Sequence, residues 1–152
     1  TLGTYNGART LFYIGCVQKE LGNFVRAIQE FQAALAIDDE NHVLSPPIKG
    51  ALLCELGSAF WGSDDRERAL DLLARAKDSF ETSGTLQSPD GARVLIVTGR
   101  LMLEIGDFSG ARDNLLAADA TMKEYGTERE LFDVQEALQE LRETVQRKSE
   151  KP

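Results

Sequence analysis

The chain has 152 residues, 42% of them hydrophobic and 28% charged, which is typical of one soluble globular domain. Its formal net charge of −8 argues against a general nucleic-acid or anionic-membrane surface, because phosphate binding needs a dominant positive field. There is no apolar run of about 18 residues and no charged segment followed by an apolar one, so the sequence predicts neither a membrane-spanning helix nor a signal peptide.

The first predicted elements are two helices joined by a glycine turn. From about Tyr5 to Leu21, and again from Phe24 to Ile37, apolar residues recur every three or four positions, which is the spacing of an amphipathic helix. Gly22 separates them, as a glycine in a left-handed C-cap commonly does. The polar residues 38–42 that follow include no apolar side chain, so we expect a turn there.

Two more helical hairpins follow. Ser45-Pro46-Pro47 and Ser88-Pro89 predict the starts of their first helices, because proline suits the first helical turn and serine can cap it. We expect their turns at residues 62–65 and at residues 106–107. Gly126 ends the third hairpin.

The stretch after Gly126 predicts a single helix. Leu131, Val134, Leu138, Leu141 and Val145 share one face of it, and its cations alternate with glutamates, which is typical of a solvated face and not of a nucleic-acid patch. We interpret it as a capping helix that covers the last hairpin.

An internal period of 42 residues relates the three hairpins. Gly15, Gly57 and Gly99 share one position, and two alanines flanking a large apolar residue follow each glycine at fixed spacing, as Ala27, Phe31, Ala34; Ala69, Leu73, Ala76; and Ala111, Leu115, Ala118. Small residues allow two helices to approach closely, and the large residue fills the space beside them. Units of this kind stack side by side, so the sequence predicts an all-α solenoid.

These positions resemble the small and large positions of tetratricopeptide repeats, and the resemblance covers about residues 5 to 126. It implies a right-handed superhelical α-solenoid of three antiparallel hairpins plus a C-terminal capping helix. We expect a single domain over residues 1–152, with repeats at about 5–42, 46–84 and 88–126 and the capping helix at about 127–148. The period exceeds the usual 34 residues and resembles the long repeats of kinesin light chains.

The resemblance also implies a partner-binding groove on the concave side, where the first helix of each hairpin presents one face. By the family's geometry that face includes Arg9, Phe12, Cys16, Lys19, Ala51, Cys54, Ser58, Trp61, Arg93, Ile96, Arg100 and Leu103. The family's Lys and Asn clamp for a C-terminal carboxylate is absent, because Phe12, Cys16 and Glu55 stand at the matching positions.

Cations among apolar residues would suit a peptide or helix of a partner protein, including an acidic segment with large apolar anchors. The alternative is that these cations are ordinary solvated residues. Trp61 is equally open: it either anchors a partner or packs beneath the neighbouring helix. Phe12 and Tyr13 are divided in the same way between the interior and the groove.

The sequence offers no catalytic constellation. His42 is the only histidine, so neither a histidine metal cluster nor a Ser-His-Asp triad can be assembled. Cys16 and Cys54 lie in apolar stretches and are interpreted as small buried hydrophobes. The pairs Asp38-Asp39 and Asp64-Asp65 are interpreted as turn or capping residues. We expect no cofactor, no metal and no enzymatic activity.

The favoured function is a non-catalytic scaffold for protein–protein interaction. A self-associating structural module and a regulatory or adaptor domain of a larger protein are the alternatives. Two isolated cysteines fit a reducing compartment, so we expect an intracellular, cytoplasmic protein. The start at Thr1 instead of Met leaves open a removed targeting segment.

Overall fold

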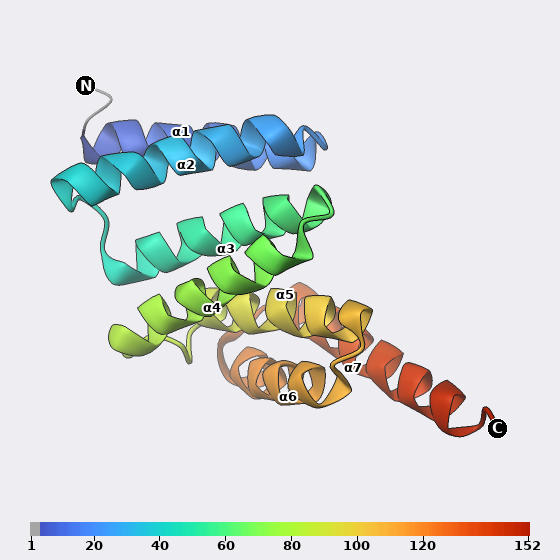
Figure 1. Cartoon of the computed structure of the whole chain (residues 1–152). Helices are drawn as coiled ribbons and strands as arrows, with labels where there is room; N and C mark the ends of the chain where they lie inside the picture. The colour runs from blue at the N-terminus through green and yellow to red at the C-terminus, as the bar shows by residue number, and fades with distance from the viewer. Residues whose placement is uncertain (1–3) are drawn as a thin grey trace. The chain divides into compact units, whose positions relative to one another are not determined.

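The structure is a computed structural model that describes residues 4–152, and its regular secondary structure there is entirely α-helical (Figure 1). The helices are α1 (Tyr5–Glu20), α2 (Phe24–Asn41), α3 (Pro46–Gly62), α4 (Arg66–Thr82), α5 (Pro89–Ile105), α6 (Phe108–Tyr125) and α7 (Glu128–Ser149). The predicted all-α class, with three hairpins followed by one further helix, is confirmed.

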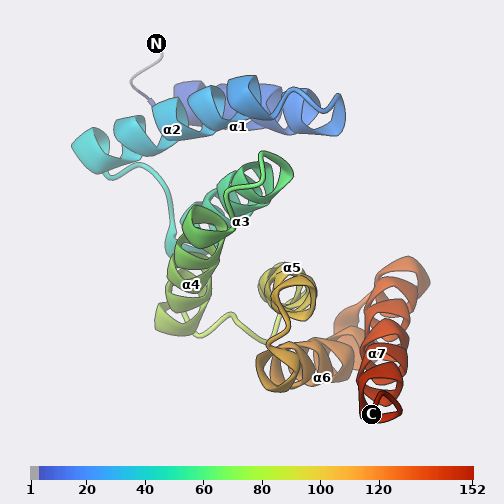
Figure 2. The same cartoon turned by 45° about the vertical axis from the view of Figure 1, so that its right-hand side comes forward.

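The chain forms two compact units, Thr1–Gly84 and Thr85–Pro152. In unit 1, α1 packs along α2 and α3 along α4, and α2 packs on α3 to join the two hairpins. In unit 2, α5 pairs with α6, and α7 packs mainly against α6 with a smaller contact to α5. Figure 2 shows α7 following α6 directly and lying beside it. The single domain over the whole chain stays a prediction.

Each hairpin is closed by the same contact between a glycine and a large apolar side chain. A Cβ atom added at Gly15 would stand 2.5 Å from the Phe31 ring, and one at Gly99 would stand 2.6 Å from Leu115 Cγ. At Gly57 the corresponding distance to Leu73 Cγ is 3.1 Å. The predicted equivalence of the three glycines is therefore confirmed, and the six alanines of the pattern are all fully buried.

The repeat extends to the turns between paired helices. Gly22, Asp64 and Gly106, 42 residues apart, all adopt left-handed backbone conformations, with φ of 79°, 67° and 87°. The next residue is the N-cap of the second helix in each case, and Asp65 accepts a hydrogen bond from the Arg68 N–H at 3.1 Å. Asp64 is the only one of the three that is not a glycine, and its backbone conformation is one that residues other than glycine rarely adopt.

The prediction of a turn at residues 38–42 was wrong, since α2 continues to Asn41. Asp38 is only 2% exposed, and its carboxylate accepts a hydrogen bond from the Leu44 N–H at 2.8 Å. Lys49 Nζ lies 2.9 Å from the same carboxylate. One residue of this polar run, Asp38, is therefore buried with its own partners, and it holds the connection between α2 and α3 in place.

Serine, proline and threonine lie at the starts of α3, α5 and α7, the helices that each follow a completed hairpin. Ser88 caps α5 by accepting the Gly91 N–H at 3.1 Å. Ser45 occupies the N-cap of α3 but its side chain forms no capping hydrogen bond, so proline alone defines that start. Thr127 and Glu130 form a reciprocal capping box at α7.

Helix α7 closes the core of unit 2. Val134, Ala137, Leu138 and Leu141 are buried against the α5–α6 hairpin, and Leu131 packs at the edge of this core. The predicted apolar face therefore covers the last hairpin. Val145 differs, because 43% of it remains exposed.

Candidate functional site

A small hollow in unit 1 gathers three of the predicted groove residues. It has a volume of about 360 Å³ and lies between the C-terminal ends of α1 and α3. Its lining consists of Lys19, Glu20, Phe24, Ser58, Trp61 and Gly62. Lys19 and Trp61 occupy the same position of two successive repeats, 42 residues apart, so equivalent faces of α1 and α3 meet in this hollow.

One lysine and two carboxylates lie close together at the hollow. Lys19 Nζ lies 2.6 Å from Glu55 Oε2 and 3.6 Å from Glu20 Oε1. Burial alone would lower the pKa of Lys19, but the hydrogen bond and the negative charge of Glu55 outweigh burial and raise that pKa above its usual 10.5. The lysine is therefore firmly protonated, and part of its charge is already neutralised within unit 1.

The wall of the hollow depends on a close approach between α2 and the end of α3. The Phe24 ring lies directly against Gly62, where a Cβ atom would overlap it. Trp61, the only tryptophan, is half-buried beside this contact. Ser58 donates its hydroxyl to the Cys54 carbonyl at 3.0 Å. Phe24 was not among the predicted groove residues, because it belongs to a second helix, although the Gly62 that admits its ring lies at a predicted turn.

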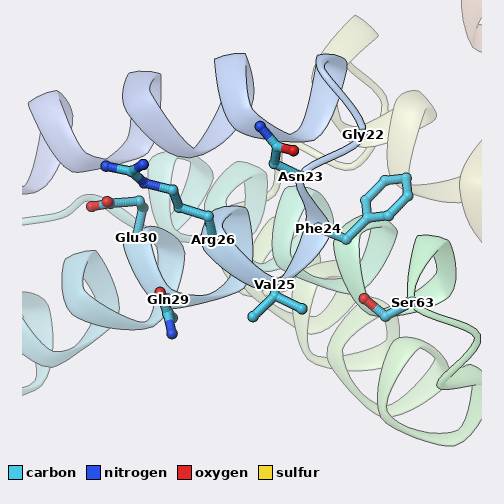
Figure 3. A pocket seen from close by; sticks show the side chains of 8 residues that line it. All are labelled: Gly22, Asn23, Phe24, Val25, Arg26, Gln29, Glu30 and Ser63. Carbon is cyan, nitrogen blue, oxygen red and sulfur yellow. The ribbon is translucent and has the colours of Figure 1, made fainter.

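A larger hollow is also lined by Phe24 and has a volume of about 1050 Å³. Figure 3 shows Phe24 and Ser63 at one end and Arg26 and Glu30 at the other. Val25, which is 70% exposed, also lines it. Its residues come from the α1–α2 turn, the start of α2 and the α3–α4 turn. From the sequence, the two turns were expected only to separate helices.

The other predicted residues of unit 1 are less accessible than expected or lie apart from the hollow. Arg9 is exposed and forms no salt bridge within the described part of the chain. Phe12 is half-buried, with its ring centroid 6.0 Å from that of Phe31, whereas Tyr13 is 58% exposed. Cys16 is half-buried and Cys54 is 3% exposed, so the Cys54 thiol belongs to the core and not to a binding surface.

In unit 2 the predicted residues lie on α5, facing solvent or α7. Arg93 is exposed, and Ile96 packs at the edge of the core. Arg100 Nη2 donates to the Asp133 carbonyl at 3.1 Å and lies 3.7 Å from Glu136 Oε2. Arg100 therefore helps to hold α7, a contact that helical periodicity could not reveal.

Residues 4–152 contain no group of three or more His, Cys, Asp or Glu side chains placed to hold a metal ion. Within the same range, every helix is too short or too polar to cross a bilayer.

The sequence profile of the tetratricopeptide repeat family matches residues 8–41, which span most of α1 and the whole of α2. No curated protein matches the sequence. The crystal structure of the Sgt2 TPR domain from Aspergillus fumigatus is similar, with a TM-score of 0.69 and 17% identity. That match covers 100% of this chain and 89% of that chain.

Two further solved structures share the fold. BtubC (BKLC) from P. vanneervenii has a TM-score of 0.71 and 19% identity, and the match covers 89% of this chain but only 57% of that chain. PcrH from Pseudomonas aeruginosa has a TM-score of 0.69 and 19% identity, with 91% of this chain and 93% of that chain covered. At these identities the likeness concerns the fold. The profile match identifies residues 8–41 as a tetratricopeptide repeat, and the glycine contact of that repeat recurs in all three hairpins.

Proposed function

We propose that this protein is a non-catalytic scaffold that binds a segment of a partner protein on the faces of its first helices. The observation that carries the proposal is the hollow where Lys19, Ser58 and Trp61 meet. Equivalent positions of two repeats line one concave site, and an aromatic residue stands beside a charged pair. Aromatic anchors in partly desolvated pockets commonly supply most of the energy of protein association.

The salt bridges of the predicted cations indicate which of them would attract an acidic segment. Lys19 is already paired with Glu55, and Arg100 with Glu136, so both contribute less to attraction than the sequence suggested. Arg9 and Arg93 are exposed and, in the part of the chain that the structure describes, outside any salt bridge. In unit 1, Arg9 would orient an acidic segment whose large apolar side chain contacts Trp61, and Arg93 stays a predicted partner contact of unit 2.

The test begins with peptides selected on the full chain from a displayed random library. Trp61→Ala should weaken the selected peptides by about tenfold or more, as hot-spot substitutions do. Ser58→Arg should weaken them too, by filling the hollow. Ile105→Ala, at an exposed apolar position of α5 that lines neither hollow, is the matched control and should leave affinity unchanged. Unchanged affinity in both hollow variants, with melting temperatures near the wild type, would contradict the proposal.

A second candidate function is self-association, which a stripe on α1 favours. Tyr13, Val17 and Leu21 are 58%, 56% and 68% exposed and follow one another at four-residue spacing, so they share a face. Sedimentation over a concentration series tests this function. Association that Val17→Glu with Leu21→Glu abolishes would support it, and a persistent monomer would count against it.

Two further aspects of function are inferred from the chain itself. Both cysteines are free thiols, which fits a reducing, cytoplasmic compartment. Partner binding of this kind also suits a regulatory or adaptor domain of a larger protein.

A further inference from the structure

A second surface, confined to unit 2, has the character of a binding groove. It runs between α6 and α7 and has a volume of about 620 Å³. Its floor consists of Phe108, Leu116, Leu138, Leu141 and Val145. Leu138 and Leu141 also belong to the core, whereas Leu116 and Val145 are each 43% exposed. A continuous apolar floor is thus left open to solvent.

The charged side chains that line this groove are of one sign, and the nearby Glu150 carboxylate accepts a hydrogen bond from the lining residue Gln146 at 3.0 Å. Arg112 on α6 and Arg142 on α7 line it, and no Asp or Glu of residues 4–152 does so. At one end Lys148 Nζ lies 4.7 Å from the centre of the Phe108 ring. Elsewhere on α7 the acidic residues turn to other partners, as Glu136 does toward Arg100. In a chain with net charge −8, this is a local basic site.

The shape of the groove favours a helix over an extended strand. Its two walls are helices, whose backbone groups are already hydrogen-bonded, so an extended segment would find no free backbone edge to pair with. Leu138, Leu141 and Val145 follow helical spacing, and ridges of this kind accept the side chains of a third helix. Apolar pockets of roughly 300 to 1,000 Å³ are of the size that binding sites commonly have.

We propose that this groove docks an amphipathic helix of a partner protein. The apolar stripe of that helix covers Leu116 and Val145, and carboxylates on its two flanks face Arg112 and Arg142. A second copy of this chain fits less well, because Arg9 on its exposed apolar helix, α1, would bring a further cation to a basic site. The groove is independent of the hollow in unit 1.

The test uses two synthetic helical peptides of about 16 residues, a length at which helices in water are still marginal and a hydrocarbon staple helps. Both carry leucine at every third and fourth position, and they differ only in having glutamate or lysine on the flanks. The wild-type chain should bind the glutamate peptide about tenfold more tightly by calorimetry, because both flanks of the helix then face arginine.

A charge reversal makes the test specific. Arg112→Glu with Arg142→Glu should invert the preference, so that the lysine peptide binds more tightly. Both arginines are exposed, so the variant should fold. Arg75→Glu with Arg129→Glu changes the net charge equally outside the groove and should keep the wild-type preference. Leu116→Glu with Val145→Glu should abolish binding of either peptide.

Three results would overturn the proposal. One is equal affinity for the two peptides, or a preference that the charge reversal leaves in place. Another is self-association of the wild type that the reversal removes, since this would identify a second copy as the occupant. The last is binding to vesicles of phosphatidylcholine with about a quarter phosphatidylserine that the reversal removes, since this would identify an anionic lipid surface.

Discussion

The ends of α2 and α6 occupy the same position in the repeat but are held by different chemistry. Asp38, Phe80 and Met122 stand 42 residues apart, and all are buried, with 2%, 0% and 2% exposed. At the α2–α3 junction of unit 1 the buried group is a carboxylate paired with Lys49. At the α6–α7 junction of unit 2 it is a methionine whose sulfur lies close to Gly126.

The repeat therefore determines that the residue at this position is buried, but it does not determine whether that residue is polar or apolar. A buried apolar side chain needs only close packing, whereas a buried carboxylate needs hydrogen-bond partners to offset its lost hydration. Asp38 obtains them from the Leu44 N–H and from Lys49. The junction in unit 1 should therefore respond to charge and pH, and the junction in unit 2 to volume.

The largest expected effect is at the apolar junction. Met122→Ala should lower the free energy of unfolding of unit 2 by about 3 kcal/mol, because truncation of a buried methionine loses transfer energy and leaves a cavity. Hydrogen exchange resolved along the chain measures this loss in α6 and α7. Met102→Ala, at a half-buried site, is the control and should cost less. A loss below about 1 kcal/mol would mean that the junction is not tightly packed.

The α2–α3 junction should lose stability when the negative charge of Asp38 is removed. Asp38→Asn should destabilise unit 1 by about 2 kcal/mol, since the amide keeps the shape but leaves the partly buried Lys49 without its closest anion. Asp39→Asn is the matched control, because Asp39 is mostly exposed and lies 3.8 Å from Lys49. Urea denaturation measures both variants. Equal small effects would show that the pair contributes little.

The stability of the two junctions should also differ in its dependence on pH. Burial alone would raise the pKa of Asp38, but the Leu44 N–H and Lys49 outweigh burial and hold that pKa below its usual 3.8. A carboxyl with a lowered pKa in the folded state stabilises the protein above its unfolded pKa, and this contribution is lost as pH falls through the folded value. The cost of Asp38→Asn should therefore stay constant from neutral pH to about pH 4 and shrink as the pH falls further.

The Met122→Ala variant serves as the control for this pH series. Its side chain does not titrate, so its cost in unfolding free energy should remain constant over the same range. A cost of Asp38→Asn that is equally constant would show that the charge of Asp38 is not what holds the junction.

The smallest expected effect concerns the start of α7. Thr127→Ala should cost about 1 kcal/mol, the usual value of a lost N-cap. It removes the hydroxyl that accepts the Glu130 N–H at 3.3 Å. Thr127→Ser retains that acceptor and should be nearly neutral. Thermal unfolding of the two variants measures the difference, and an equal loss in both would assign the effect to the threonine methyl group.

Much of the fold follows from the sequence because burial follows the repeat. Gly15, Gly57 and Gly99, with the large residue 16 positions after each, identify every hairpin, and the structure confirms all three contacts. The period alone could not show that Asp38 is buried, because its polarity matches a turn and its partners lie several residues away in the chain.

The candidate site was less predictable than the fold. Lys19, Ser58 and Trp61 meet as equivalent helix faces should, but the pairing of Lys19 with Glu55 depends on how closely α1 approaches α3. Arg100 was expected to face a partner, and the structure shows in addition that it contacts α7. Helical periodicity identifies which face a residue occupies, and it does not identify which helix lies opposite.

The central proposal, that a partner segment binds where α1 and α3 meet, is tested most directly by nuclear magnetic resonance. The full chain is labelled with ¹⁵N and titrated with a peptide selected from the displayed library. The account predicts the largest shifts at the Trp61 indole N–H and at the amides of Lys19 and Ser58. Shifts confined to α2 and α4, with the Trp61 indole unmoved, would contradict it.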